Sequence, residues 1–278
     1  MEIEVSPLLY KSIQALAAKR TMLKRERNVI ETIAIGSSHG DFGFDPRYCD
    51  NSFNLCYRSL DLKHSFGLYN YACNALPNLK NIIVFYSAFS SGFSLERSIG
   101  EKEISVAVSE LFELGFAYDD KVLRESADKI KDHFNDYEVD VGGKRGFFTA
   151  GKGFLSESIG VEARSSSHMK YNSNKEFNLY LAKIISLSKK MGHKVYVVIP
   201  PVRSDYRKAV GKDFESIFSS LLELKNDFDL GCDFPIINFY SDEGFVDSYF
   251  GDFDHLIPSG DGARLLSLVI GNVLKGGD

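Results

Sequence analysis

Short apolar runs recur along the chain between longer segments of helical periodicity, and this alternation constrains the fold more than any other feature of the sequence. The clearest runs read IIVFY at 82–86 and VYVVI at 195–199, and weaker ones lie at 32–35 and 236–239. Strands that are apolar on both faces are typical of parallel sheets covered by helices on each side. The pattern predicts an α/β fold of three αβα layers with a central parallel sheet of about five strands.

Three segments carry the periodicity and the end signals of helices. Residues 7–30 form the first, and we interpret its basic side chains as a solvated face in preference to a membrane-binding one. These basic residues are Lys19, Arg20, Lys24, Arg25 and Arg27. Residues 175–191 form the second, which Gly192 should end in a left-handed conformation. The last helix should begin with Ser259 as its N-cap and Asp261 in its first turn.

The 278 residues are predicted to form a single domain, because a hydrophobic content of 44% supports one large core. The N-terminal helix at about 7–30 precedes the first strand. A stretch at about 97–174 contains no convincing strand. It is helical at 101–135 and then glycine-rich and polar around GGKRGFFTAGKG. We interpret it as a helical and loop insertion that borders the functional site.

Composition excludes several classes of protein. The net charge is −5, and no concentrated basic face is present, so nucleic acid is not an expected partner. The four cysteines form no CxxC pair, which argues against a zinc knuckle or a disulfide framework and favours a reducing compartment. Acidic residues stand where a signal peptide would be basic, and no apolar run reaches the roughly 18 residues of a membrane span. We therefore expect a cytoplasmic protein without an integral membrane segment.

The first apolar run ends in the sequence IGSSHG at 35–40. A serine flanked by glycines just beyond a parallel strand should lie on a tight turn at the carboxyl edge of the sheet, where open α/β folds bind ligands. If a helix follows Ser38, its first amides would also stabilise an oxyanion. The simpler interpretation is an ordinary turn between a strand and a loop.

A serine hydroxyl is a weak nucleophile and needs a histidine base, which a carboxylate usually orients. Asp252 and His255 lie in GDFDHLIP, between the last strand and the last helix, so they should return to the same sheet edge as Ser38. There Asp252 would bind Nδ1 of the imidazole and leave Nε2 for the serine. Asp61 and His64 repeat this spacing in LDLKH, and we interpret them as a surface pair on a helix.

These motifs resemble a known family. The sequence GSSH at 36–39 and the Asp252-x-x-His255 spacing resemble the first and last blocks of the SGNH (GDSL-like) hydrolase superfamily. The Gly-x-Ser-His form is similar to bacterial enzymes that acylate or deacylate cell-surface polymers. The runs IIVFYSAFS, VYVVIPP and FVDSYFGDFDHLIPSGDGA also resemble that group, so the similarity covers most of the chain outside the insertion. It implies a flavodoxin-like form of the fold and a Ser-His-Asp acyl-enzyme mechanism on O-acyl, commonly O-acetyl, esters of sugars.

The chain departs from this family where the oxyanion donors are expected. Ser37 replaces the usual aspartate, and the second-block glycine and third-block asparagine have no clear counterpart. Ser59, Ser87 and Ser90 are candidates for their role, and a buried structural serine is the simpler interpretation of each. The sequence GSSHG also fits the nucleophile elbow of α/β-hydrolases, although that fold takes its acid and its base from separate loops.

We expect a carbohydrate-directed serine acyl enzyme that uses Ser38, Asp252 and His255. An O-acetyltransferase is favoured over an esterase, because the insertion would help to exclude water. Acetyl-CoA is then the expected donor, and no metal or other cofactor is required. His168 is either a substrate contact or an exposed loop histidine, and Arg203 either binds an anionic sugar or a coenzyme A phosphate or forms a surface salt bridge. Alternatives are a non-catalytic glycan-binding or assembly protein and an α/β-hydrolase-type esterase.

Overall fold

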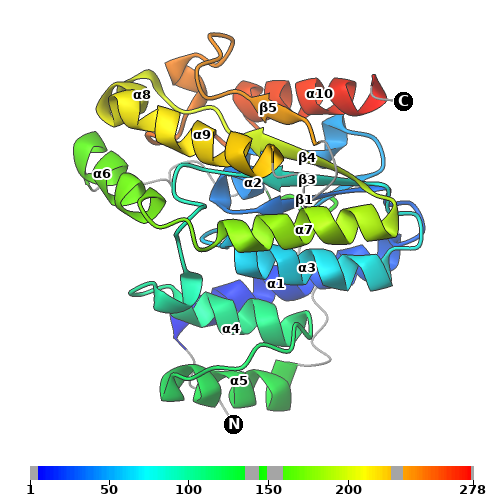
Figure 1. Ribbon diagram of the computed structural model, residues 1–278. Coiled ribbons are helices and arrows are strands. Elements are labelled where there is room, and N and C mark those ends of the chain that lie inside the picture. The colour runs from blue at the N-terminus through cyan, green and yellow to red at the C-terminus, as the bar shows by residue number, and fades with distance from the viewer. Residues whose placement is uncertain (1–5, 135–143, 149–158, 227–233, 277–278) are drawn as a thin grey trace.

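A five-stranded, all-parallel sheet forms the centre of the molecule (Figure 1). The computed structural model describes residues 6–134, 144–148, 159–226 and 234–276. The strands are β1 (Thr32–Gly36), β2 (Ser52–Asn54), β3 (Asn81–Phe85), β4 (Lys194–Ile199) and β5 (Ile236–Asn238). Their order in the sheet is β2-β1-β3-β4-β5, which is the order of the flavodoxin-like doubly wound folds. The predicted α/β class and the central parallel sheet are confirmed.

Helices cover both faces of this sheet (Figure 1). On one side lie α1 (Pro7–Glu26), α3 (Leu62–Ala75) and α7 (Asn178–Met191), and on the other lie α2 (Ser38–Gly43) and α10 (Asp261–Lys275). The remaining α-helices are α4 (Lys102–Leu111), α5 (Lys121–Phe134), α6 (Val161–Asn172), α8 (Ser204–Val210) and α9 (Phe214–Lys225). Short 3-10 turns occur at Pro46–Tyr48, Leu95–Arg97, Gly211–Asp213 and Asp247–Tyr249.

Successive side chains of each strand enter different cores, because neighbours along a strand point to opposite faces. Ile33 and Ile35 of β1 join the larger apolar cluster, whereas Ala34 between them joins the smaller one. In β4, Val197 and Val198 divide in the same way. Burial on both faces explains why these strands read as continuous apolar runs in the sequence.

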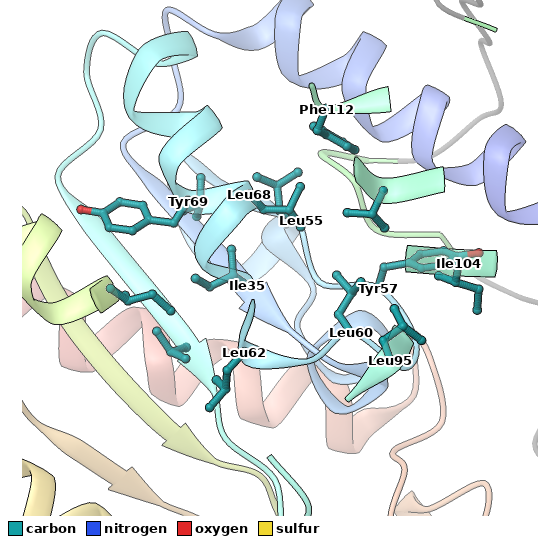
Figure 2. Packing of buried hydrophobic residues seen from close by; sticks show 14 of the residues in the cluster. Ile35, Leu55, Tyr57, Leu60, Leu62, Leu68, Tyr69, Leu95, Ile104 and Phe112 are labelled. Carbon is teal, nitrogen blue, oxygen red and sulfur yellow. The ribbon is translucent and has the colours of Figure 1, made fainter. Parts of the chain in front are cut away.

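The first half of the predicted insertion is packed into the main core. Ile104 of α4 belongs to the larger cluster and lies near Tyr57, Leu60 and Leu95 (Figure 2). Apolar side chains of α5, among them Leu123, belong to the same cluster. Helix α4 packs against α1, and α5 packs against α4. Residues 135–143 and 149–158 of the insertion lie outside the described residues, as does Cys232.

Helix α1 is shorter than predicted, and two of its basic side chains are buried instead of exposed. It ends at Glu26, short of residue 30. Lys24, Arg25 and Arg27 are exposed as predicted, but Lys19 and Arg20 are buried, so the solvated-face interpretation is wrong for these two. Lys19 Nζ donates to Asp41 Oδ1 of α2 at 2.8 Å and to the carbonyl oxygens of Asn54 and Cys56. A buried ammonium is stable here because each of its three hydrogens finds an acceptor.

The ends of the other two predicted helices are nearly as expected. Gly192 ends α7 with a φ of 75°, which is the predicted left-handed cap. The N-cap of α10 is Gly260 and not Ser259, although Asp261 does lie in its first turn. Ser259 instead adopts a φ of 59° and accepts a hydrogen bond from Arg47. None of the helices in the described part of the chain has the combination of length and apolarity needed to cross a bilayer.

Candidate active site

Ser38 lies on a tight turn between β1 and α2, at the carboxyl edge of the sheet. Gly36 makes this turn with a φ of 133°, and a Cβ there would come within 2.8 Å of the Phe85 carbonyl oxygen. Ser38 is the first residue of α2, so its amide has no acceptor one turn earlier in the helix. Its side chain is half-buried, whereas Ser37 is only 1% exposed. Of these two serines, Ser38 is the more accessible to solvent.

The end of β2 and the residues directly after it hold the turn in place. Asn54 Nδ2 donates to the carbonyl oxygens of Gly40 at 2.8 Å and Phe44 at 2.7 Å, so it binds the middle of α2 and its C-cap. Gly40 packs so closely that an added Cβ would meet Cys56 Sγ at 2.4 Å. The ion pair of Lys19 with Asp41 adds a third tie. These contacts hold α2, and with it Ser38, against the sheet.

His255 reaches Ser38 from the loop between β5 and α10. The antiparallel bridge of Phe250 with Leu256 closes this loop. Asp252 Oδ1 accepts hydrogen bonds from the amides of Asp254 at 3.0 Å and His255 at 2.8 Å. Asp252 also lies 2.9 Å from Nδ1 of His255, and Nε2 of the same ring lies 2.7 Å from Ser38 Oγ. The structure thus brings together the three predicted residues, which lie 217 positions apart in sequence at their widest contact.

The charges around His255 favour its role as a proton acceptor. Burial lowers the pKa of His255, but Asp254 and Asp252 outweigh burial and raise it above its ordinary value. Burial opposes ionisation of Asp252, yet the hydrogen bond from His255 holds the pKa of this carboxyl below its usual range. An ionised Asp252 accepts hydrogen from Nδ1 and leaves the lone pair of Nε2 for the Ser38 hydroxyl.

A second buried carboxylate, Asp254, lies next to this triad. Its oxygens lie 3.1 Å from Arg164 Nη2, 3.2 Å from His39 Nε2, 3.5 Å from His255 Nδ1 and 3.8 Å from His168 Nδ1. Burial would raise its pKa, but His255 above all, with His39 and His168, holds it well below the usual range. Four nitrogen-bearing side chains from three parts of the chain thus converge on one anion.

His39 links this carboxylate to the turn that carries Ser38. Burial lowers the pKa of His39, so the ring is neutral, and its Nδ1 lies 2.8 Å from Ser87 Oγ. With Asp254 ionised, Nε2 carries the hydrogen and Nδ1 accepts one from Ser87. Ser37 Oγ lies 3.3 Å from both His39 Nδ1 and Ser87 Oγ, so it belongs to this inner network and not to the triad.

Two predicted oxyanion donors are engaged elsewhere. Ser87 Oγ contacts His39, and Ser90 Oγ accepts a hydrogen bond from the Ser87 amide at 2.8 Å, so both fit the structural interpretation. Ser59 lies in the loop after β2 with a φ of 60° and is half-buried. That loop continues beside the turn, because the Tyr57 amide donates to the Gly36 carbonyl at 3.1 Å.

His168 and Arg203 lie near the site without facing Ser38 directly. His168 is not an exposed loop residue, since it is buried on α6, where its Nδ1 lies 2.7 Å from the Tyr206 hydroxyl. Burial lowers its pKa to about 3, so the ring is neutral. Arg203 forms a two-pronged ion pair with Asp205 and lies over the ring of Phe253, which matches the salt-bridge interpretation.

The second Asp-x-x-His sequence is not at the surface. Asp61 and His64 are fully buried at the start of α3, so the surface-pair interpretation is wrong. Asp61 caps the helix by accepting from the His64 amide at 2.9 Å, and it also accepts from the Leu95 amide at 2.8 Å. The two side chains lie 2.6 Å apart. This pair fixes the start of α3. Its hydrogen bonds in the described part of the chain go to α3 and Leu95 and do not include Ser38.

Sequence reasoning missed His39, Asp254 and Arg164 as parts of the site. His39 directly follows Ser38, and Asp254 directly precedes His255, so adjacency to the motif was the available signal. Arg164 lies in the insertion and has no motif around it. Its contact with Asp254 places Arg164 next to the candidate site.

One group of residues has the composition of a metal site. His39, Asp254 and His255 place potential ligand atoms within 4.8 Å of one another. The two imidazole rings are tilted, with centroids 4.7 Å apart and planes 32° apart. Arg164 places a cation against Asp254, which disfavours a second cation at this carboxylate.

A scan of the chain against protein-family models and a search for similar curated proteins found no match. The site is therefore judged on its own geometry. Acid and base lie on one loop, three residues apart, whereas the α/β-hydrolase alternative takes them from separate loops.

Proposed function

We propose that this protein is a serine acyl-ester enzyme that forms an acyl intermediate on Ser38. The observation that carries the proposal is the Ser38 Oγ to His255 Nε2 distance of 2.7 Å, in a ring whose Nδ1 is bound by Asp252. A base within hydrogen-bonding reach of a hydroxyl and oriented by a third group is the arrangement that activates serine.

In the first step, Ser38 Oγ attacks the ester carbonyl carbon while His255 takes the hydroxyl proton. The carbonyl π bond becomes an oxyanion, for which the Ser38 amide at the start of α2 is a donor. Collapse of this intermediate breaks the bond to the leaving oxygen, which receives the proton from His255. An acceptor hydroxyl then repeats the sequence in reverse and frees Ser38.

The substrate class follows from the resemblance to SGNH enzymes. We propose an O-acyl, most simply O-acetyl, ester of a carbohydrate or cell-surface polysaccharide. Transfer to a sugar hydroxyl is slightly favoured over hydrolysis, with acetyl-CoA as a candidate donor. Support for transfer comes from α6, since its Arg164 and His168 pack against the loop of His255 and add cover on that side. We further propose a cytoplasmic location.

A second candidate is a non-catalytic glycan-binding or assembly protein on the same scaffold. The observation in its favour is that the Ser87 hydroxyl contacts His39 and the Ser90 hydroxyl accepts from the Ser87 amide, so both candidate oxyanion donors are engaged in other contacts. A missing donor costs about 3–4 kcal/mol of barrier in a serine enzyme.

Turnover of p-nitrophenyl acetate by the purified protein separates the two candidates. We expect release of p-nitrophenol by the wild type and loss of release in Ser38→Ala, with Ser37→Ala as the matched control that retains it. Adding a neutral oligosaccharide and analysing it by mass spectrometry distinguishes transfer from hydrolysis. Saturable oligosaccharide binding without turnover in the folded wild type would instead establish the binding protein.

A further inference from the structure

We propose that Asp254 is a second carboxylate of the site, a positioning residue that holds His255 and shares the positive charge which forms on it. The inference rests on the proposed function and assigns a role to a residue outside the Ser38, His255 and Asp252 triad.

The contacts of Asp254 differ from those of a structural carboxylate. Asp254 is 1% exposed, and in the described part of the chain neither of its oxygens accepts a well-aligned hydrogen bond. Buried Asp61, in contrast, accepts from two backbone amides at 2.8–2.9 Å and from His64. Buried carboxylates that only fix a loop normally have such bonds. Asp254 instead lies 3.1–3.8 Å from nitrogens of four charged or ionisable side chains.

These partners come from three parts of the chain that meet at the site. Arg164 belongs to α6, His39 belongs to α2 directly after Ser38, and His255 belongs to the same loop as Asp254. A carboxylate in this position connects the base loop to the nucleophile turn and to α6. Its longer contacts adapt more readily than aligned hydrogen bonds when His255 gains a proton.

Asp254 also acts electrostatically in the proposed reaction. When Ser38 transfers its proton, the imidazolium has Asp252 at 2.9 Å and Asp254 at 3.5 Å from Nδ1. Arg164 opposes this charge from α6. The groups around His255 are Ser38, His39 and Phe42 of α2, Asp252 and Asp254 of its own loop, and Arg164 and His168 of α6, the last two through electrostatic interactions.

Asp254 and Arg164 have opposite effects on the pKa of His255. His255 is a base only when neutral, so the rate of Ser38 acylation should rise as pH passes the raised pKa of His255. Removing the Asp254 charge lowers that pKa and moves the rise to lower pH. Removing the Arg164 charge does the opposite. A residue with a purely structural role would reduce the rate without moving the midpoint.

The test measures Ser38 labelling by a fluorophosphonate as a function of pH in wild type, Asp254→Asn and Arg164→Gln. We expect midpoints displaced to lower and higher pH, respectively, and a rate at high pH that falls no more than about tenfold in Asp254→Asn. Arg97→Gln is the matched control, because it removes an arginine whose exposed ion pair with Glu176 lies elsewhere, and its midpoint should match the wild type.

A second readout needs no reaction. NMR titration of ¹³C-labelled histidine in a Ser38→Ala background reports the pKa of His255 directly, and the same two substitutions should displace it in opposite directions. Unmoved midpoints, or displacements in the same direction, would overturn the role of Asp254. Arg164 is partly exposed, so its variant carries the test alone if Asp254→Asn does not fold. Absence of labelling in the wild type while the NMR shifts occur as expected would count against the proposed function and not against the Asp254 contact.

Discussion

Two Asp-x-x-His segments of this protein have nearly the same local geometry and very different surroundings. In both, the aspartate accepts from the histidine amide, at 2.8 Å for Asp252 and 2.9 Å for Asp61. In both, the same carboxylate lies within 3.0 Å of the histidine Nδ1. The spacing therefore produces an oriented imidazole by local geometry alone.

The second nitrogen of each ring separates the two segments. Nε2 of His255 meets the Ser38 hydroxyl at 2.7 Å. Nε2 of His64 is buried without a hydrogen-bond partner among the described residues, and its ring meets the edge of Phe116. Asp61 in addition caps α3 and binds the Leu95 amide, which are structural tasks. In the proposed mechanism, the chemistry therefore depends on the third partner, Ser38, which a distant part of the chain supplies.

Exchanging each histidine for alanine gives the largest expected contrast. His255→Ala should lower the rate of Ser38 acylation by about 10⁴ to 10⁶-fold, because the serine loses its base. His64→Ala should leave the rate per folded molecule within about twofold of the wild type and reduce the free energy of unfolding by about 1–3 kcal/mol. Stopped-flow acylation and denaturant unfolding of both variants measure these effects. An equal loss of rate in folded His64→Ala would transfer the catalytic role to the other segment.

Substitution of the two aspartates should show the same contrast with smaller changes in the acylation rate. Asp252→Asn is expected to lower acylation by about 10² to 10⁴-fold, because asparagine no longer fixes the required tautomer. Asp61→Asn should instead affect stability. Burial opposes ionisation of Asp61, but His64 lowers its pKa, so the ionised form stabilises the fold at neutral pH and this contribution is lost as pH falls through the lowered pKa.

Urea unfolding of wild type and Asp61→Asn at neutral and acidic pH measures that contribution. The difference in unfolding free energy between the two proteins should shrink as the pH is lowered. A difference that stays constant with pH would show that the Asp61 charge is not what stabilises this end of α3.

The fold could be predicted from the sequence because buried strands require apolar residues. Strands β3 and β4 are buried along nearly their whole length, so IIVFY and VYVVI had to be apolar at every position. Strand β2 was not found, since its three residues, Ser52–Asn54, are two-thirds polar and owe their place to pairing with β1. The prediction for Lys19 was wrong because periodicity does not reveal that three oxygen atoms in the core accept hydrogen bonds from its ammonium group.

The triad was accessible for a different reason. Ser38, Asp252 and His255 lie beside strand ends or in a short loop, where position relative to the sheet follows from topology. The Asp-x-x-His spacing gave no sign that Asp61 and His64 are buried. Asp252 and His255 are buried as well, so burial does not distinguish the two pairs. The contacts of Asp254 depend on α6, whose placement no local pattern specifies. Long-range packing therefore sets the part of the site that sequence reasoning missed.

Identification of the residue that a fluorophosphonate modifies tests the central claim most directly. Peptide mass spectrometry of the labelled protein should place the adduct on Ser38, which is half-buried and contacts His255, and not on buried Ser37. Ser38→Ala should abolish labelling, and His255→Ala should reduce it to the background rate. A label on Ser37, or a folded wild-type protein that takes no label across the pH range, would contradict the assignment of Ser38 as the nucleophile.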